Sequence, residues 1–331
     1  MTQPQSIEQR ADTFRITFQQ VRDEIHRVFV GHDALVEQAL IAFFCQGHAL
    51  IEGAPGLGKT LLVRTIANTL RLSYARVQCT PDLLPGDVTG TNILTEAPDG
   101  GRTFVFHPGP IFANIVLADE INRATPRTQS AFLEAMQEGH VTVFGTTHPL
   151  AAPFSVFATQ NPIEMEGTYP LPEAQLDRFF FKLLMPSPTA DELAEIVTRT
   201  TGHAVAAPAA HVGADTVHAM TSLIREVPIA DDVLRTALRM VRATHPDADE
   251  APLNVRKYVR YGASPRAAQT LVLGAKARAL LQSRYHVSRD DLRAIAPAAL
   301  RHRVLLNFQA ELDRISSDAL VADVLSTVAD H

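Results

Sequence analysis

Apolar positions up to about residue 188 follow two spacings, one typical of helices and one of buried strands. Short, continuous apolar runs such as Ile115–Ala118 are typical of strands that are buried on both faces of a sheet. The predicted strands lie near residues 49–51, 74–79, 115–118, 141–144 and 154–159. Apolar residues at helical spacing predict helices over 7–28, 33–46, 61–67 and 125–138. This alternation predicts an α/β fold with a parallel, doubly wound sheet.

The pattern changes at two places along the chain. A hairpin is predicted over 90–106, because the turn sequence Pro98-Asp99-Gly100-Gly101 joins two short extended segments. After Pro186-Ser187-Pro188 the pattern becomes almost wholly helical and rich in Ala, Arg and Leu. We therefore predict an α/β core over residues 1–188 and an all-α domain over residues 189–331.

Composition and charge narrow the classes of protein that fit. The 331 residues are enough for two domains, and the net charge of −6 argues against nucleic acid as the default partner. Cys45 and Cys79 lie in apolar surroundings and predict buried, reduced thiols. The polar N-terminus has no apolar signal core, and the longest apolar run, Ala39–Cys45, is too short to cross a bilayer. We expect a soluble cytoplasmic protein.

The segment after the first predicted strand has the spacing of a phosphate-binding loop. It reads Gly53-Ala54-Pro55-Gly56-Leu57-Gly58-Lys59-Thr60, and Leu61 continues into a predicted helix. Glycines let the backbone curl so that its N–H groups point at phosphate oxygens. Lys59 can then reach the β- and γ-phosphates, and the Thr60 hydroxyl can ligate Mg²⁺. The helix places its positive end at the phosphates.

Polar residues at two other strand ends complete a candidate hydrolytic site. Asp119 and Glu120 follow the buried run 115–118, where Asp119 can hold Mg²⁺ opposite Thr60 and Glu120 can act as general base toward water. Asn161 follows the strand near 154–159, and its amide can bridge the γ-phosphate and the attacking water. Two arginines, Arg178 and Arg266, are candidates for stabilising phosphate charge.

These stretches, in this order, resemble the motifs of AAA+ ATPases. The sequence around and between them resembles that of the MoxR family. Gly53–Thr60 matches Walker A, and Ile115–Glu120 matches Walker B. The matches to sensor 1, the arginine finger and sensor 2 are Asn161, Arg178 and Arg266. The similarity extends from about residue 27 to residue 310, and segments 88–108 and 140–154 match hairpin insertions that lie near a ring pore.

The resemblance implies an ATP-hydrolysing ring, expected to be a hexamer, with Mg²⁺ as the metal cofactor. Its ATP site would lie between subunits, so that Arg178 would reach the neighbour's γ-phosphate. Arg266 would sense the nucleotide of its own subunit, and Arg123 is a weaker candidate for facing the adjacent site. Val30 and Gly31 would lie near the adenine.

The resemblance also implies a chaperone-like role with a partner that carries a von Willebrand factor A domain, in metal insertion or complex maturation. A nucleotide-gated binding switch is the alternative, although the intact Glu120 favours turnover. A nucleic-acid motor is a third reading, but segment 88–108 has only Arg102 as a basic residue, and segment 140–154 has none apart from histidines. GTP is an alternative to ATP as the bound nucleotide, although the sequence lacks an Asn-Lys-x-Asp motif for guanine.

Overall fold

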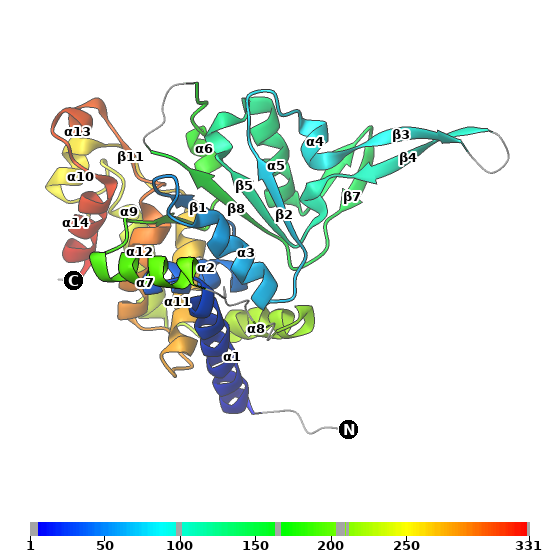
Figure 1. Cartoon of the computed structure of the whole chain (residues 1–331). Coiled ribbons are helices and arrows are strands. Elements are labelled where there is room, and N and C mark those ends of the chain that lie inside the picture. The colour runs from blue at the N-terminus through cyan, green and yellow to red at the C-terminus, as the bar shows by residue number, and fades with distance from the viewer. Residues whose placement is uncertain (1–5, 97–100, 163–166, 203–208, 210–211, 330–331) are drawn as a thin grey trace.

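A five-stranded parallel sheet forms the centre of the protein (Figure 1). The computed structural model describes residues 6–96, 101–162, 167–202, 209 and 212–329. In spatial order the strands are β2 (Tyr74–Gln78), β5 (Ile115–Asp119), β8 (Ser155–Gln160), β1 (Ala49–Glu52) and β9 (Phe181–Leu184). All neighbouring pairs are parallel, which confirms the predicted α/β class. The phosphate-loop strand β1 therefore lies beside β8, and β5 lies on the other side of β8.

Helices cover both faces of this sheet, as its apolar strands require. Along β5, Ile115 and Leu117 pack on one side and Val116 and Ala118 on the other, and all four are fully buried. The first side packs against α1 (Ile7–Val28), α2 (Asp33–Phe44) and α3 (Lys59–Thr69). The second side packs against α5 (Pro126–Glu138).

Capping residues explain where two of these helices begin and end. Ser6 accepts the backbone N–H of Gln9, and the Gln9 side chain accepts the N–H of Ser6, so α1 starts at the predicted residue. Thr125 caps α5, and Gly139 ends it at a positive φ of 66°. Shorter helical segments are α4 (Pro85–Thr89), α6 (Glu173–Leu176), and the 3₁₀ turns Pro110–Phe112 and Ile121–Arg123.

Two antiparallel hairpins extend from the core. Strands β3 (Gly90–Glu96) and β4 (Arg102–Pro108) form the predicted hairpin, which reaches far from the body of the molecule in Figure 1. Its predicted turn at 98–101 falls mostly outside the described residues. Strand β6 (His140–Val143) pairs with β7 (Thr146–Pro149) in a separate sheet, so the strand predicted at 141–144 belongs to a hairpin rather than to the parallel sheet.

Where the structure describes it, the C-terminal region is helical, as predicted, apart from one short strand pair. Its elements are α7 (Ala190–Thr201), α8 (Ala214–Glu226), α9 (Asp231–Arg242), α10 (Leu253–Tyr258), β10 (Val259–Tyr261), α11 (Pro265–Leu281), α12 (Arg289–Leu300), β11 (Leu305–Leu306), α13 (Phe308–Leu312) and α14 (Ser317–Ala329). Strands β10 and β11 pair antiparallel. Within the described part of the chain, no helix is both long and apolar enough to cross a membrane.

This helical region packs closely on the sheet. At Gly274 in α11, an added Cβ would lie 2.8 Å from Ile295 of α12 and 3.2 Å from the Phe181 ring of β9. Glycine is therefore the residue that lets α11 approach both neighbours. One hydrophobic cluster runs from the sheet through these helices. The packing therefore does not separate the α/β core from the C-terminal helical region. The boundary between residues 188 and 189 stays a prediction.

Candidate functional site

The loop between β1 and α3 takes a path that needs glycine. Gly56 and Gly58 have φ angles of 80° and 93°, a region that residues with a side chain rarely adopt. At Gly58 an added Cβ would also lie 3.2 Å from the Phe29 ring, so the loop fits closely against the segment after α1. Helix α3 begins at Lys59, directly after this turn, and directs its positive end into the loop.

Lys59 is held over the loop by two backbone carbonyls. Its ammonium group donates to the Gly53 oxygen at 2.6 Å and to the Ala54 oxygen at 2.8 Å. A lysine has three N–H donors, so one remains for a phosphate oxygen. Burial lowers the pKa of Lys59, and the nearby charges of Asp119 and Glu120 act in the opposite direction.

Asp119 ends β5 as a nearly buried carboxylate whose two oxygens have different partners. Its Oδ1 accepts from the Thr159 hydroxyl at 2.6 Å. Its Oδ2 accepts from the Thr60 hydroxyl at 3.2 Å and from two nitrogens of Arg76, Nε at 2.9 Å and Nη2 at 2.7 Å. The predicted pairing of Thr60 with Asp119 is therefore present in the structure.

Glu120 follows Asp119 in a left-handed conformation, with a φ of 57°. Its backbone N–H donates to the Thr159 hydroxyl oxygen at 2.8 Å, which fixes this turn against β8. Its carboxylate accepts from the Gln78 amide at 3.0 Å and from Arg123 at 3.2 Å. A positive φ in a residue other than glycine is uncommon and is concentrated at functional turns.

One cavity of about 410 Å³ gathers these groups. It is lined by Pro55, Gly56, Leu57, Gly58, Lys59, Thr60, Leu61, Arg76, Asp119, Glu120 and Asn161. The predicted Walker A residues from Pro55 onward, both carboxylates and Asn161 thus meet at the carboxyl ends of β1, β5 and β8, which is where ligands bind in open α/β sheets, whereas Gly53 and Ala54 do not line the cavity.

The oxygen atoms on one side of this cavity fit a magnesium ion. The Thr60 hydroxyl and an Asp119 carboxylate oxygen lie 3.2 Å apart, and hard oxygen donors of this kind are those that Mg²⁺ prefers. Magnesium commonly retains several of its waters in proteins, so two protein ligands suffice beside phosphate oxygens. Thr60 and Asp119 are therefore suited to hold it.

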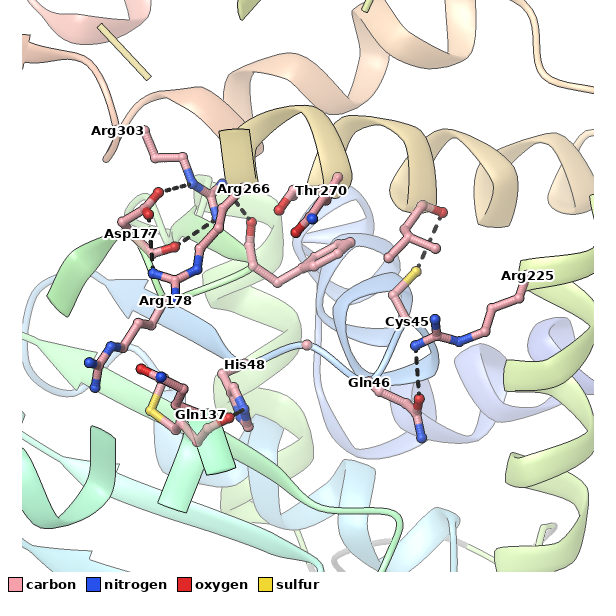
Figure 2. A pocket seen from close by; sticks show the side chains of 15 residues that line it. Cys45, Gln46, His48, Gln137, Asp177, Arg178, Arg225, Arg266, Thr270 and Arg303 are labelled. Atoms are coloured by element: carbon pink, nitrogen blue, oxygen red, sulfur yellow. Dashed lines mark hydrogen bonds and ion pairs between the residues drawn. The ribbon is translucent and has the colours of Figure 1, made fainter. Parts of the chain in front are cut away.

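Arg178 and Arg266 lie together in a second cavity of about 310 Å³, and neither lines the first (Figure 2). Arg178 donates to the Leu133 carbonyl at 3.1 Å. Arg266, just inside the N-terminus of α11, approaches Asp177 at 3.4 Å and is about half exposed. The structure therefore groups the two arginines with each other rather than with the phosphate loop.

Asp177 connects this cavity to the helical region. It accepts from the Ser264 hydroxyl at 2.8 Å and from Arg303 Nε at 3.0 Å, as Figure 2 shows for Arg303. Arg303 is buried and also donates to the carbonyls of Phe179 and Phe180. Burial lowers the pKa of Arg303 to about 10, and the charge of Asp177 opposes this shift.

Val30 and Gly31 lie next to the loop but do not line the phosphate cavity. Gly31 has a φ of 71°, and an added Cβ would meet the Glu192 carboxylate of α7 at 2.1 Å. The segment is thus enclosed between the loop, through Phe29, and α7. Its predicted place near the adenine stays a prediction.

Sequence reasoning missed three residues of the site: Arg76, Gln78 and Thr159. Gln78 is paired in register with Asp119 across β2 and β5, and Arg76 precedes it by two residues on the same side of the strand. Thr159 stands one position before the end of β8. Polar side chains at the carboxyl end of a predicted parallel strand were the available signal, which identified Asp119, Glu120 and Asn161 but was not applied to the three missed residues.

Comparisons with known proteins identify the family. A model of the ATPase family associated with various cellular activities (AAA) matches residues 48–181, and an AAA lid domain model matches residues 252–324. The chaperone MoxR1 of Mycobacterium tuberculosis is 41% identical over 312 residues, which cover 92% of this chain and 80% of that protein. The chain belongs to the MoxR family of AAA+ ATPases.

Two further similarities agree with this membership. Protein MoxR of Methylorubrum extorquens is 30% identical over 321 residues, which cover 92% of this chain and 91% of that protein. The crystal structure of a Cytophaga hutchinsonii protein assigned as an ATPase covers 97% of this chain and 96% of its own, with a TM-score of 0.89 and 38% identity. The MoxR resemblance and the predicted AAA+ core with a helical lid are confirmed.

Proposed function

We propose that this MoxR-family chain hydrolyses ATP to ADP and phosphate in the 410 Å³ cavity, and that an oligomeric ring couples turnover to the remodelling of a partner protein. One observation carries the proposal. The cavity brings together a phosphate loop, a lysine, a hydroxyl–carboxylate pair for Mg²⁺, a second carboxylate and an asparagine, which is the set that phosphoryl transfer to water requires.

Each residue has a separate task in this proposal. The loop and Lys59 bind the β- and γ-phosphates, and Thr60 and Asp119 would hold Mg²⁺. When bound, Mg²⁺ neutralises charge on the phosphate oxygens. Glu120 accepts the proton of the water that attacks the γ-phosphorus, and Asn161 orients that water. The bond between the γ-phosphorus and the β,γ-bridging oxygen breaks, and that oxygen leaves with ADP.

The arginines support a site shared between subunits. Arg178 and Arg266 line the second cavity with each other and are not among the residues that line the phosphate cavity. The resemblance assigned Arg178 to a neighbour's γ-phosphate and Arg266 to the nucleotide of its own subunit. Their common cavity favours a neighbouring nucleotide for both, in a ring that we propose to be a hexamer.

Family membership and exposed aromatic side chains on the two hairpins both support a protein as the partner. A chaperone name among the relatives and the MoxR membership support a protein substrate, which we propose to carry a von Willebrand factor A domain and to be matured, for example by metal or cofactor insertion. The hairpins expose Phe104 and Phe144, at 70% and 78%. Exposed aromatic side chains at the ends of hairpins suit contact with a polypeptide.

The test is ATP turnover as a function of protein concentration for the wild type, Glu120→Gln and Arg178→Ala. We expect specific activity to rise with concentration as rings assemble. Glu120→Gln should keep ATP binding and assembly but lose turnover, and Arg178→Ala should assemble but turn over slowly. If specific ATPase activity does not depend on protein concentration and Arg178→Ala turns over ATP as fast as the wild type, the shared site is rejected. A nucleotide-gated switch is then favoured.

A second measurement separates the protein remodeller from a nucleic-acid motor. The segments 88–108 and 140–154 together carry Arg102 as their one basic side chain apart from histidines. Affinity for DNA depends on phosphate neutralisation and is strongest at low salt. We expect no binding to single- or double-stranded DNA at low salt, and strong salt-dependent binding would support the motor.

A further inference from the structure

Arg76 places a cation on the carboxylate proposed to hold the metal. It lies on β2, at the edge of the sheet, and donates from Nε and Nη2 to Oδ2 of Asp119 at 2.9 and 2.7 Å. Both nitrogens therefore bind one oxygen, and Arg76 also lines the phosphate cavity. Its Nη2 has a second acceptor, the Gln78 amide oxygen, at 2.6 Å.

The hydrogen bonds around Asp119 leave little room for another ligand. A carboxylate has about four lone-pair positions, two on each oxygen. Oδ2 already accepts from Arg76 twice and from Thr60, and Oδ1 accepts from the buried Thr159 hydroxyl. A metal ion, or a water bound to one, therefore cannot use Oδ2 while Arg76 keeps both of its bonds.

Two other basic side chains near the carboxylates, Lys59 in the cavity and Arg123 beside Glu120, do not take this position. Lys59 donates to the Gly53 and Ala54 carbonyls, and Arg123 pairs with Glu120 rather than with Asp119. The Arg76 side chain is 48% exposed, whereas that of Asp119 is 9% exposed. The acid is fixed by its surroundings, and the arginine at the sheet edge has space to move away.

We propose that Arg76 and Mg²⁺ compete for Asp119, so that Arg76 acts as a positioning residue that sets how strongly nucleotide binding depends on the metal. The inference rests on the proposed ATPase site, because it needs Mg²⁺ at Thr60 and Asp119. Without the metal, Arg76 balances the charge of Asp119 and lets the phosphates approach. With the metal, Arg76 leaves Oδ2, and the loss of its two charged hydrogen bonds weakens metal binding.

The experiment measures the affinity for fluorescent mant-ADP, once in EDTA and once in saturating Mg²⁺. The ratio of the two affinities is the coupling between metal and nucleotide, and it does not depend on turnover. Arg76→Ala should raise this ratio by at least about tenfold over the wild type, because it removes a charge-assisted competitor. Arg76→Gln keeps much of the side-chain length without charge and should raise it similarly, whereas Arg76→Lys should stay closer to the wild type.

Arg123→Ala is the matched control, because it removes one positive charge from the same acidic pair without touching Asp119. Its ratio should stay within about threefold of the wild type if only Arg76 competes with the metal. An unchanged ratio in both uncharged Arg76 variants, or an equal rise in Arg123→Ala, would overturn the inference. If the wild type binds no mant-ADP in either buffer, the proposed nucleotide site itself fails.

Discussion

Thr159 and Asp119 are joined by a short hydrogen bond, 2.6 Å from the threonine hydroxyl to Oδ1 of the carboxylate. The same hydroxyl accepts the backbone N–H of Glu120 at 2.8 Å. One fully buried side chain of β8 therefore orients the acid proposed to hold the metal and fixes the backbone of the proposed general base. Removing it should disturb both carboxylates without changing any charge.

Thr159→Val keeps the shape of the side chain but loses its donor and its acceptor. We expect ATP turnover to fall by at least about tenfold, because a hydrogen bond to a charged group contributes about 1.5–3 kcal/mol. The loop residues proposed to bind the phosphates are unchanged, so mant-ADP affinity in EDTA should change by less than about threefold. Thr159→Ser restores the hydroxyl and should recover most turnover. Wild-type turnover in Thr159→Val would contradict this role.

The parts of the site that are encoded locally could be predicted from the sequence. The phosphate loop has its glycines and Lys59 within a single stretch, and Asp119 follows a four-residue apolar run typical of a buried strand. The first helix was predicted over residues 7–28 from the helical spacing of its apolar residues, and the capping box at Ser6 and Gln9 in the structure is an equally local signal for its start. Such signals need no knowledge of the fold.

Contacts between distant strands could not be predicted in this way. The bond from Arg76 to Asp119 depends on the register of β2 against β5, and residues 76 and 119 are far apart in the sequence. Strand β9 was missed because Phe181–Leu184 is short and follows directly on a turn. The place of Arg266 depends on how the helical region packs on the core, which no local pattern specifies.

Arg303 should be a strong determinant of stability. Its buried guanidinium binds Asp177 and the carbonyls of two residues that lead into β9. Arg303→Met would remove the buried partner of Asp177 and a donor to both carbonyls, and breaking a buried ion pair costs about 3–5 kcal/mol. We expect a loss of unfolding free energy of this size in guanidinium denaturation followed by circular dichroism.

Arg266→Ala provides the comparison, because Arg266 approaches the same Asp177 from a half-exposed position at 3.4 Å. Exposed ion pairs contribute about 0–1 kcal/mol, so this variant should unfold within about 1 kcal/mol of the wild type. Equal losses for the two variants would mean that burial does not distinguish these arginines.

Two aromatic rings of β4, Phe106 and Phe104, should affect stability differently when they are removed. Phe106 stacks on His148 at a ring-centroid distance of 3.8 Å and thereby joins β4 to β7, whereas Phe104 is 70% exposed. Phe106→Ser should lower the unfolding free energy by at least about 1 kcal/mol, since it loses the aromatic pair and buried area. Phe104→Ser should stay within about 0.5 kcal/mol of the wild type. Denaturation of both variants under one condition is the check, and the reverse order would contradict it.

His48 should make the fold sensitive to mild acid. It is buried beside β8, where its Nδ1 accepts the Val156 N–H and its Nε2 lies 3.0 Å from the Met136 carbonyl. Burial lowers its pKa from 6.5 to about 4, so the folded protein keeps the ring neutral between these values while the unfolded chain protonates it. The unfolded state then binds more protons, and stability is complete above about pH 6.5 and is lost as the pH falls toward 4.

The size of this effect follows from the two pKa values. Between pH 7 and pH 5, protonation of the unfolded chain at this one site lowers the unfolding free energy by about 2 kcal/mol. His48→Gln lacks a titrating group, so the wild type should lose about 2 kcal/mol more than the variant over this interval. Subtracting the two curves removes the contribution of His302, whose pKa burial also lowers, and of the carboxylates. Parallel curves would show that His48 is protonated equally in the folded and unfolded chains.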